Sequence, residues 1–448
     1  MTTKTATDLP ETTLAQRPGR WMDGWDPEDA NQWASGGKQI ANRNLGFSIF
    51  AEFLGFAVWA LWSIVVPQLN NVGFTLDTNQ MFWLVSVPAL VGATLRIPYT
   101  IAVPIFGGRN WTIVSALLLI IPAGGLAWAV NHPELPFGAL VAIAALAGLG
   151  GGNFASSMAN IAYFFPQAEK GKALGLNAAG GNIGTAAVQF AVPLVIIAGS
   201  GIALDRAGLM FIPLCLLAAG FAFFGMNNLS SAKANPRVYA EAAKEPHTWI
   251  LSIIYIGTFG SFIGYAGAFP TLLKSQFPQV SLSLAFMGAL VGSISRPLGG
   301  MLADKVGGAR VTIVSMLAIA LGAAGAIAGL QTRNFVLFFG SFMWLFIFTG
   351  VGNGSVYRMI PAVFTSLSDG TEQAKSRALA VTAGCIGIAG AIGAIGGFLI
   401  PRGFALSTQL SGGIVPALYG FIGVYLVLTV LTWAVYARKS AALAAAAV

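Results

Sequence analysis

The feature that most constrains this fold is a series of long apolar segments that are almost free of charge. Each is close to the roughly 20 residues that an α-helix needs to cross a bilayer. Only 9% of the 448 residues are charged, whereas a soluble domain carries about 25%. The sequence therefore predicts an all-α membrane protein with twelve transmembrane helices. The predicted spans are 45–68, 80–104, 110–130, 137–164, 172–199, 207–226, 248–273, 282–303, 309–330, 335–365, 376–400 and 414–436.

The predicted spans fall into two halves that repeat each other. Residues 89–96 (ALVGATLR) return as 289–296 (ALVGSISR), and the glycines of 148–152 return in 350–354. Two parallel repeats, related by an axis along the membrane normal, are typical of one class of secondary transporter. We therefore expect two pseudo-symmetric six-helix bundles.

Polar stretches divide the chain into parts. We predict a cytoplasmic N-terminal segment 1–44, a first bundle 45–226, a linker 227–246, a second bundle 247–437 and a C-terminal tail 438–448. The N-terminal segment carries Trp21, Trp25 and Trp33 among acidic residues. This pattern is compatible with a regulatory role, or with tryptophans that lie at the membrane surface.

Lysine and arginine orient the predicted bundle. They are concentrated on the side of the N-terminus, and the opposite loops hold only Arg206, Lys274, Arg333 and Arg402. Because positive residues mark the cytoplasmic side, both termini are predicted to be cytoplasmic in a multi-pass protein of the cell (plasma) membrane. The net charge of +8 arises largely from these flanking residues, so we expect a lipid bilayer as partner and no nucleic acid. We also expect a monomer.

Two arginines lie inside predicted spans at equivalent points of the repeat, Arg96 and Arg296. A charge in lipid is costly and calls for a physical reason. A structural ion pair is one reason, but the only acid inside a predicted span is Glu52, which cannot neutralise both. A guanidinium presents a planar fork of donors that suits a planar oxoanion. The pair therefore predicts a central anion-binding site.

A second motif follows the eighth predicted span. It reads Gly300-x-x-x-Asp304-Lys305-x-Gly307-Gly308-x-Arg310. This motif resembles the signature loop of the major facilitator superfamily, and it implies the fold of that superfamily. Its glycines allow a tight turn and its charges can cap helix ends. In the first half Arg109 is kept, but Pro104 stands where the aspartate is expected.

The fifth predicted span combines glycines with asparagines. Gly180 and Gly181 either let helices pack closely, as small residues do in membranes, or line the anion site. Asn177 and Asn182 need hydrogen-bond partners in a membrane interior, and either could donate to an anion. Both interpretations stay open from the residues alone.

Together these segments resemble one branch of the superfamily. Residues 150–160 (GGGNFASSMAN) and 173–184 (ALGLNAAGGNIG) look like the nitrate signature of the nitrate/nitrite porter family. Further matches are residues 25–29 (WDPED), 96–99 (RIPY), 259–264 (FGSFIG) and 394–397 (AIGG). The resemblance covers nearly the whole chain.

The resemblance implies roles for individual residues of the site. Arg96 and Arg296 match the two arginines that bind the substrate, and Phe154 and Phe259 match the aromatic rings that sandwich the flat anion. Polar residues that line the site are matched by Tyr255 and Asn182.

Two further charged residues lie in predicted spans, Glu52 and Arg358. Glu52 could reach water at the interface, or it could carry a proton across the membrane. Both residues are placed towards the cytoplasm and in different halves. They could therefore pair when the cytoplasmic entrance closes and separate when it opens.

The function expected from these observations is secondary active import of nitrate, with nitrite as second substrate, by alternating access. Glu52 favours nitrate/proton symport, and nitrate/nitrite exchange or transport of another small anion is the alternative. An enzyme is disfavoured, because the chain has two histidines and no cluster of metal ligands or nucleophile–base pair. We therefore expect no metal or cofactor. An anion channel fits the repeat and the signature loop less well than a carrier.

Overall fold

The computed structural model describes residues 15–197, 201–233, 236–369 and 371–438. Its helices form twelve rods that are long and apolar enough to cross a membrane, which confirms the predicted number. The rods are Ala30–Val72, Thr78–Phe106, Gly108–Ala129, Phe137–Phe164, Gln167–Ile196, Asp205–Gly225, Pro246–Gln276, Leu282–Val306, Gly308–Gln331, Phe335–Ser366, Glu372–Ser411 and Val415–Ala437. Of the predicted tail 438–448, all but Arg438 lies outside the described residues.

Several rods consist of more than one helix. In the first half the helices are α1 (Ala30–Gln32), α2 (Lys38–Val65), α3 (Thr78–Phe106), α4 (Gly108–Leu118), α5 (Ile120–Ala129), α6 (Phe137–Leu146), α7 (Gly148–Phe164), α8 (Gln167–Ile196), α9 (Asp205–Leu209) and α10 (Phe211–Gly225). After them come α11 (Pro236–Lys244), α12 (Pro246–Tyr255), α13 (Ser261–Gln276), α14 (Phe286–Val306), α15 (Gly308–Gln331), α16 (Phe335–Ser366), α17 (Glu372–Ala394), α18 (Gly396–Ser411) and α19 (Val415–Thr432). A π-helical turn, Ile256–Gly260, joins α12 to α13.

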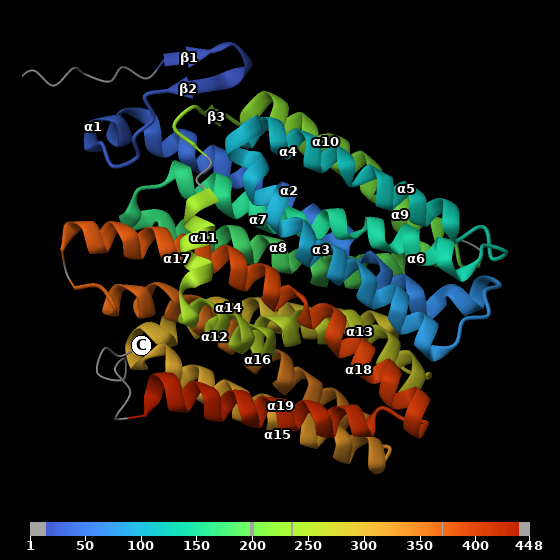
Figure 1. Cartoon of the computed structure of the whole chain (residues 1–448). Coiled ribbons are helices and arrows are strands. Elements are labelled where there is room, and N and C mark those ends of the chain that lie inside the picture. Colours follow the sequence, from blue (N-terminus) through green and yellow to red (C-terminus); the bar gives the residue numbers. More distant parts are fainter. Residues whose placement is uncertain (1–14, 198–200, 234–235, 370, 439–448) are drawn as a thin grey trace, which may run out of the picture.

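Figure 1 shows the two halves as separate groups of helices that run side by side, blue to green and yellow to red. Both described chain ends lie at the left of this view; we call that the terminal side and the opposite end the far side. Between the halves, α3 packs against α17 and α18, and α8 packs against α14. The far-side helix α13 also reaches α2, whereas α12, the terminal-side part of the same rod, packs within its own half.

Close approach of helices within a half depends on glycine. A Cβ on Gly150 of α7 would collide with the carbonyl oxygen of Gly55 in α2. Larger side chains there would push α2 and α7 apart, which is why small residues mark close helix contacts in membranes.

The two loops that follow α3 and α14 have the same backbone. Gly107 and Gly307 each have a positive φ, 86° and 93°, where the chain turns from one rod into the next. An L-residue rarely adopts this conformation, so the turn requires glycine. The tight turn expected of the signature loop is thus present in both halves.

A small sheet on the terminal side ties the N-terminal segment to the linker. Strand β1 (Ala15–Arg17) pairs antiparallel with β2 (Trp21–Asp23), and β2 pairs parallel with β3 (Asn228–Leu229). The linker is therefore not a plain polar connection: it contributes β3 and the helix α11, which packs on α17.

The tryptophans of the N-terminal segment have protein partners. Trp25 is buried, its ring lies 5.6 Å from Phe164, and its Nε1 donates to the carbonyl of Tyr163. Trp33 packs against Phe165. Of the two interpretations of these residues, contact with the membrane surface does not hold for Trp25, because the end of α7 covers it.

A second correction concerns Arg402, which we expected in a far-side loop. It lies inside α18, because the eleventh rod continues to Ser411. Its guanidinium donates to Asn79 of α3 at 2.7 Å and lies 4.1 Å from the Trp83 ring. It therefore joins the two halves near their far side.

Candidate functional site

Arg96 and Arg296 are brought together where the two halves meet. Arg96 comes from α3 and is 2% exposed, and Arg296 comes from α14 and is 6% exposed. The guanidinium carbons lie 4.6 Å and 5.9 Å from the ring centroid of Phe154. One phenyl ring is thus in contact with both guanidinium groups, as a shared central site requires.

Aromatic rings form the wall of this site. Phe154 and Phe259 are close to parallel, with centroids 6.4 Å apart and planes at 28°. Phe259 also lies 5.1 Å from the Arg96 guanidinium and stacks on Tyr255. A planar ion between two rings needs about two contact distances of roughly 3.5 Å, so the rings must part slightly to admit it.

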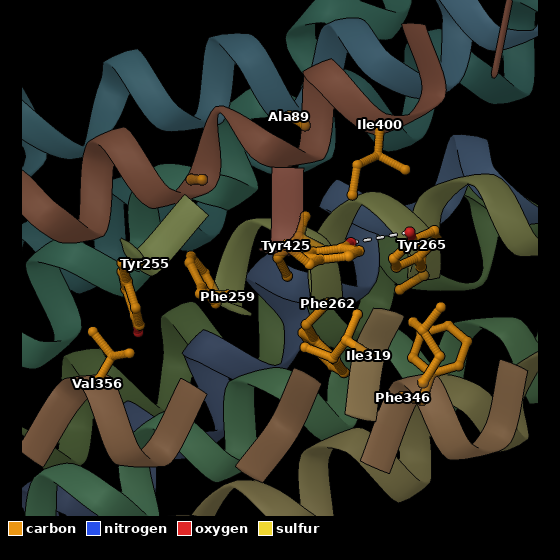
Figure 2. Packing of buried hydrophobic residues seen from close by; sticks show 14 of the residues in the cluster. Ala89, Tyr255, Phe259, Phe262, Tyr265, Ile319, Phe346, Val356, Ile400 and Tyr425 are labelled. Carbon is orange, nitrogen blue, oxygen red and sulfur yellow. Dashed lines mark hydrogen bonds between the residues drawn. The ribbon is translucent and has the colours of Figure 1, made fainter. Parts of the chain in front are cut away.

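Figure 2 shows how the rings are held in place. Tyr255 and Phe259 continue along the same rod into Phe262 and Tyr265, which pack with Phe346, Ile319 and Tyr425 in the core of the second half. Because these residues form one buried cluster, the second half holds Tyr255 and Phe259 in place as one aromatic wall of the site. The π-helical turn Ile256–Gly260 contributes Phe259, and such turns often occur at functional positions.

Several buried donors in the site have no hydrogen-bond partner among the residues that the structure describes. They are Nε and Nη2 of Arg96 and Nη1 of Arg296; the buried side-chain amides of Asn153, which precedes Phe154, and of Asn182 in α8 are also unpaired. Buried polar groups are usually paired, because an unpaired one costs about 1–3 kcal/mol. This set therefore fits a ligand that accepts hydrogen bonds and carries negative charge.

Other donors of the site are already engaged. Arg96 Nη1 donates to the carbonyl of Gly390 in α17 at 2.8 Å, which links the two halves. The hydroxyl of Tyr255 donates to Asn353 of α16 at 2.8 Å. Arg96 and Tyr255 are thus positioned by the opposite half or by a neighbouring helix.

Sequence reasoning missed two neighbours of the arginines and did not assign two buried asparagines to the site. Trp59 lies 5.9 Å from the Arg96 guanidinium, and Tyr357 lies 5.6 Å from that of Arg296. Asn353 is buried within the glycine segment 350–354, and Asn153 is buried directly after the glycine segment 148–152. Their place in or next to those segments is a signal that could have identified the two asparagines, whereas no pattern singled out Trp59.

Glu52 is more deeply buried than expected. It is 0% exposed, and its Oε2 accepts hydrogen bonds from Ser157 and, at 2.5 Å, from Asn177. The interpretation that Glu52 reaches water at the interface is therefore wrong. The physical reason is that α7 and α8 pack over the carboxylate, with Ser157, Asn177 and Gly181 in contact with it.

The glycines of α8 make room for α2. A Cβ on Gly180 would collide with Ile49, and one on Gly181 would come 2.5 Å from Glu52 Oε1. Gly180 and Gly181 were predicted to lie beside the anion or to allow close helix packing. In the structure both pack against α2. Asn177 likewise faces Glu52, and Asn182 of this helix is buried with neither the nitrogen nor the oxygen of its amide hydrogen-bonded.

Arg358 does not contact Glu52 in this structure. It pairs with Asp304 of the signature loop, with its Nε 2.6 Å from the carboxylate, and both side chains are about half exposed. Gly300 lies beside the Arg358 side chain, and Lys305 and Arg310 are exposed at the same loop. One exposed ion pair therefore connects α14 to α16 on the terminal side.

The site holds no group suited to metal binding: in the described ranges, no three His, Cys, Asp or Glu residues come together. Two buried positive charges, one buried carboxyl, aromatic walls and unpaired amides remain. Such an arrangement can bind a small anion without covalent chemistry.

Comparison with known proteins identifies the class. The sequence profile of the Major Facilitator Superfamily matches residues 47–394. The fold resembles the xylose transporter XylE from E. coli, with a TM-score of 0.63 at 16% identity over 86% of this chain and 95% of that one. The chain is therefore a multi-pass membrane transporter of the major facilitator superfamily and not an enzyme.

Curated relatives narrow the class further. The nitrate/nitrite transporter NarU of Salmonella typhimurium is 42% identical over 93% of this chain and 96% of its own length. The "Probable nitrate/nitrite antiporter NarK2" of Thermus thermophilus is 36% identical over 96% and 99%. This chain belongs to the nitrate/nitrite porter family.

Proposed function

We propose that this protein carries nitrate and nitrite across the plasma membrane by alternating access around Arg96 and Arg296. The observation that carries the proposal is the set of unpaired guanidinium donors against the Phe154 ring. The curated relatives, which are named for nitrate and nitrite, support the choice of substrate.

The chemistry of the walls suits a flat, weakly hydrated ion. Nitrate presents three oxygens in one plane to the forks of donors, while its faces can rest against Phe154 and Phe259. A tetrahedral phosphate does not fit between parallel rings, and a small halide lacks acceptors spaced to match the fork.

Both termini are proposed to be cytoplasmic, so the terminal side faces the cytoplasm. The positive loop residues of that side support this orientation. The halves contact each other through α13 and α18 on the opposite side. We therefore assign the far-side contacts to the outer gate.

Glu52 is proposed to couple nitrate uptake to a proton. When Glu52 is ionised and the site is empty, the charges of Arg96, Arg296 and Glu52 add to a net charge of one positive. A proton on Glu52 together with one bound nitrate leaves the same sum. The loaded and the empty carrier then cross the membrane with equal charge, so one proton and one nitrate would be carried together without net charge movement.

Nitrate/nitrite exchange is the second candidate, and the antiporter named among the relatives favours it. In exchange Glu52 stays ionised, and only the loaded site is neutral. Exchange then requires that only the neutral, loaded site reorients, whereas symport requires that the empty site with its one positive charge reorients as well.

The test is uptake of labelled nitrate into proteoliposomes with an inward proton gradient and no internal nitrate or nitrite. Symport predicts accumulation that collapses when the gradient is dissipated and is lost in Glu52→Gln. The matched control is Glu134→Gln, which changes an exposed carboxyl outside the spans in the same way. Uptake that needs internal nitrite and survives in Glu52→Gln would instead establish exchange.

A further inference from the structure

One buried amide joins the halves on the far side of the arginines. Gln189 of α8 is 0% exposed, and its Nε2 donates to the carbonyl of Ala266 in α13 at 2.7 Å. The same nitrogen lies 3.1 Å from Ser63 Oγ in α2. A single side chain thus connects three rods, two from the first half and one from the second.

The acceptor is available because of a proline. In an α-helix the carbonyl of residue 266 normally accepts the N–H of residue 270. That residue is Pro270, inside α13, and proline has no N–H. The Ala266 carbonyl is therefore buried without its helical partner, and Gln189 supplies the missing donor from the other half.

A small cavity lies beside this contact. It has a volume of about 30 Å³ and is lined from both halves, by Ser63, Val85, Thr185 and Ala266 among others. Trp59 also lines it, and the Trp59 ring is 5.9 Å from the Arg96 guanidinium. A space of this size can hold water. It therefore lies between the two halves, with Trp59 joining it to the arginine site and Ser63 and Ala266 joining it to the Gln189 contact.

We propose that Gln189 is the positioning residue of the outer gate. Its amide holds the halves closed through the carbonyl that Pro270 leaves free. When the far side opens, the Gln189 amide and the Ala266 carbonyl separate and both are hydrated through the adjoining cavity. The inference rests on alternating access, but not on which anion is carried.

The argument predicts a specific effect for Gln189→Leu. Leucine fills similar space but leaves the Ala266 carbonyl unpaired in the closed state, which costs free energy only while that carbonyl is buried. Ser63 keeps its hydrogen bond to the Ala60 carbonyl. Opening to water removes that cost. The variant should therefore open on the far side roughly 3- to 10-fold more often, the range set by one neutral hydrogen bond.

Labelling of Val85→Cys by a membrane-impermeant thiol reagent from the far side measures this opening. Val85 lines the cavity and is buried, and the natural Cys215 and Cys385 are fully buried and give the background. Asn70→Cys, exposed on the same side, is the control and should label at an unchanged rate. An unchanged Val85→Cys rate in Gln189→Leu would overturn the proposal.

Pro270→Ala separates a gate from a merely structural role. Alanine restores the N–H, so the Ala266 carbonyl regains its helical partner. Gln189→Leu should then raise the labelling rate less than two-fold in the Pro270→Ala background. An undiminished effect there would show that the carbonyl is not the relevant partner. Thiol labelling needs no transported anion. The gate can therefore be tested even if the protein does not take up nitrate.

Discussion

The two loops that follow α3 and α14 have the same backbone turn, but the charged side chain is buried in the first loop and exposed in the second. In the first half Arg109 is buried and donates to the carbonyl of Phe223 at 2.8 Å and 3.0 Å, and to that of Gly19 at 3.3 Å. Asn228 of β3 accepts from the Asn110 N–H at 3.2 Å. In the second half the charges of the loop are exposed, and Asp304 pairs with Arg358 near the surface.

This difference explains why the first-half motif can lose its aspartate. Pro104 stands in that place, but the N-terminal segment and the linker supply hydrogen bonds that hold the loop and the end of α10. The second half has an exposed ion pair there, and such pairs contribute about 0–1 kcal/mol; its one buried side-chain hydrogen bond to the loop backbone, among the described residues, runs from Ser355 to the Gly308 carbonyl at 2.7 Å. The terminal side of the first half is therefore the more firmly fixed of the two.

The largest effect is expected at the anion site, where the two halves also differ, because Arg96 bonds to the opposite half through Gly390. Arg96→Lys or Arg296→Lys keeps the charge but loses the fork, and one charge-assisted hydrogen bond is worth about 1.5–3 kcal/mol. Nitrate affinity, measured by titration calorimetry, should fall roughly 10- to 100-fold. The loss should be greater for Arg96, which also bonds to Gly390 of the other half. Unaltered affinity in either variant would refute binding by the fork.

A smaller effect is expected at the first loop. Arg109→Ala removes buried hydrogen bonds to two carbonyls and should destabilise the protein by about 2 kcal/mol. Arg310→Ala changes an exposed arginine of the second loop and should stay within about 0.5 kcal/mol. Thermal unfolding in detergent compares the two, and equal shifts would contradict the asymmetry.

The smallest effect is expected at the exposed ion pair. Asp304→Asn, Arg358→Gln and the double variant should differ in stability by no more than about 1 kcal/mol, because water screens both side chains. A double-mutant cycle on thermal unfolding gives the coupling energy. A coupling well above that value would mean that the second loop is held as firmly as the first.

The sequence determined the class of fold because the solvent imposes it. Twelve apolar runs had to become twelve helices, since a backbone in lipid must satisfy its hydrogen bonds within each segment. Charge in lipid is rare enough that Arg96 and Arg296 could be singled out without coordinates. The turn at Gly107 and Gly307 was likewise readable from local residues.

What only the tertiary structure decided is how side chains meet across helices. Glu52 faces Asn177 and Ser157 rather than water or Arg358, because α7 and α8 pack over its carboxylate. Gly180 and Gly181 pack on α2, and Gln189 reaches a carbonyl that Pro270 left free in the other half. Such contacts depend on the register and rotation of whole helices, which no local pattern of residues specifies.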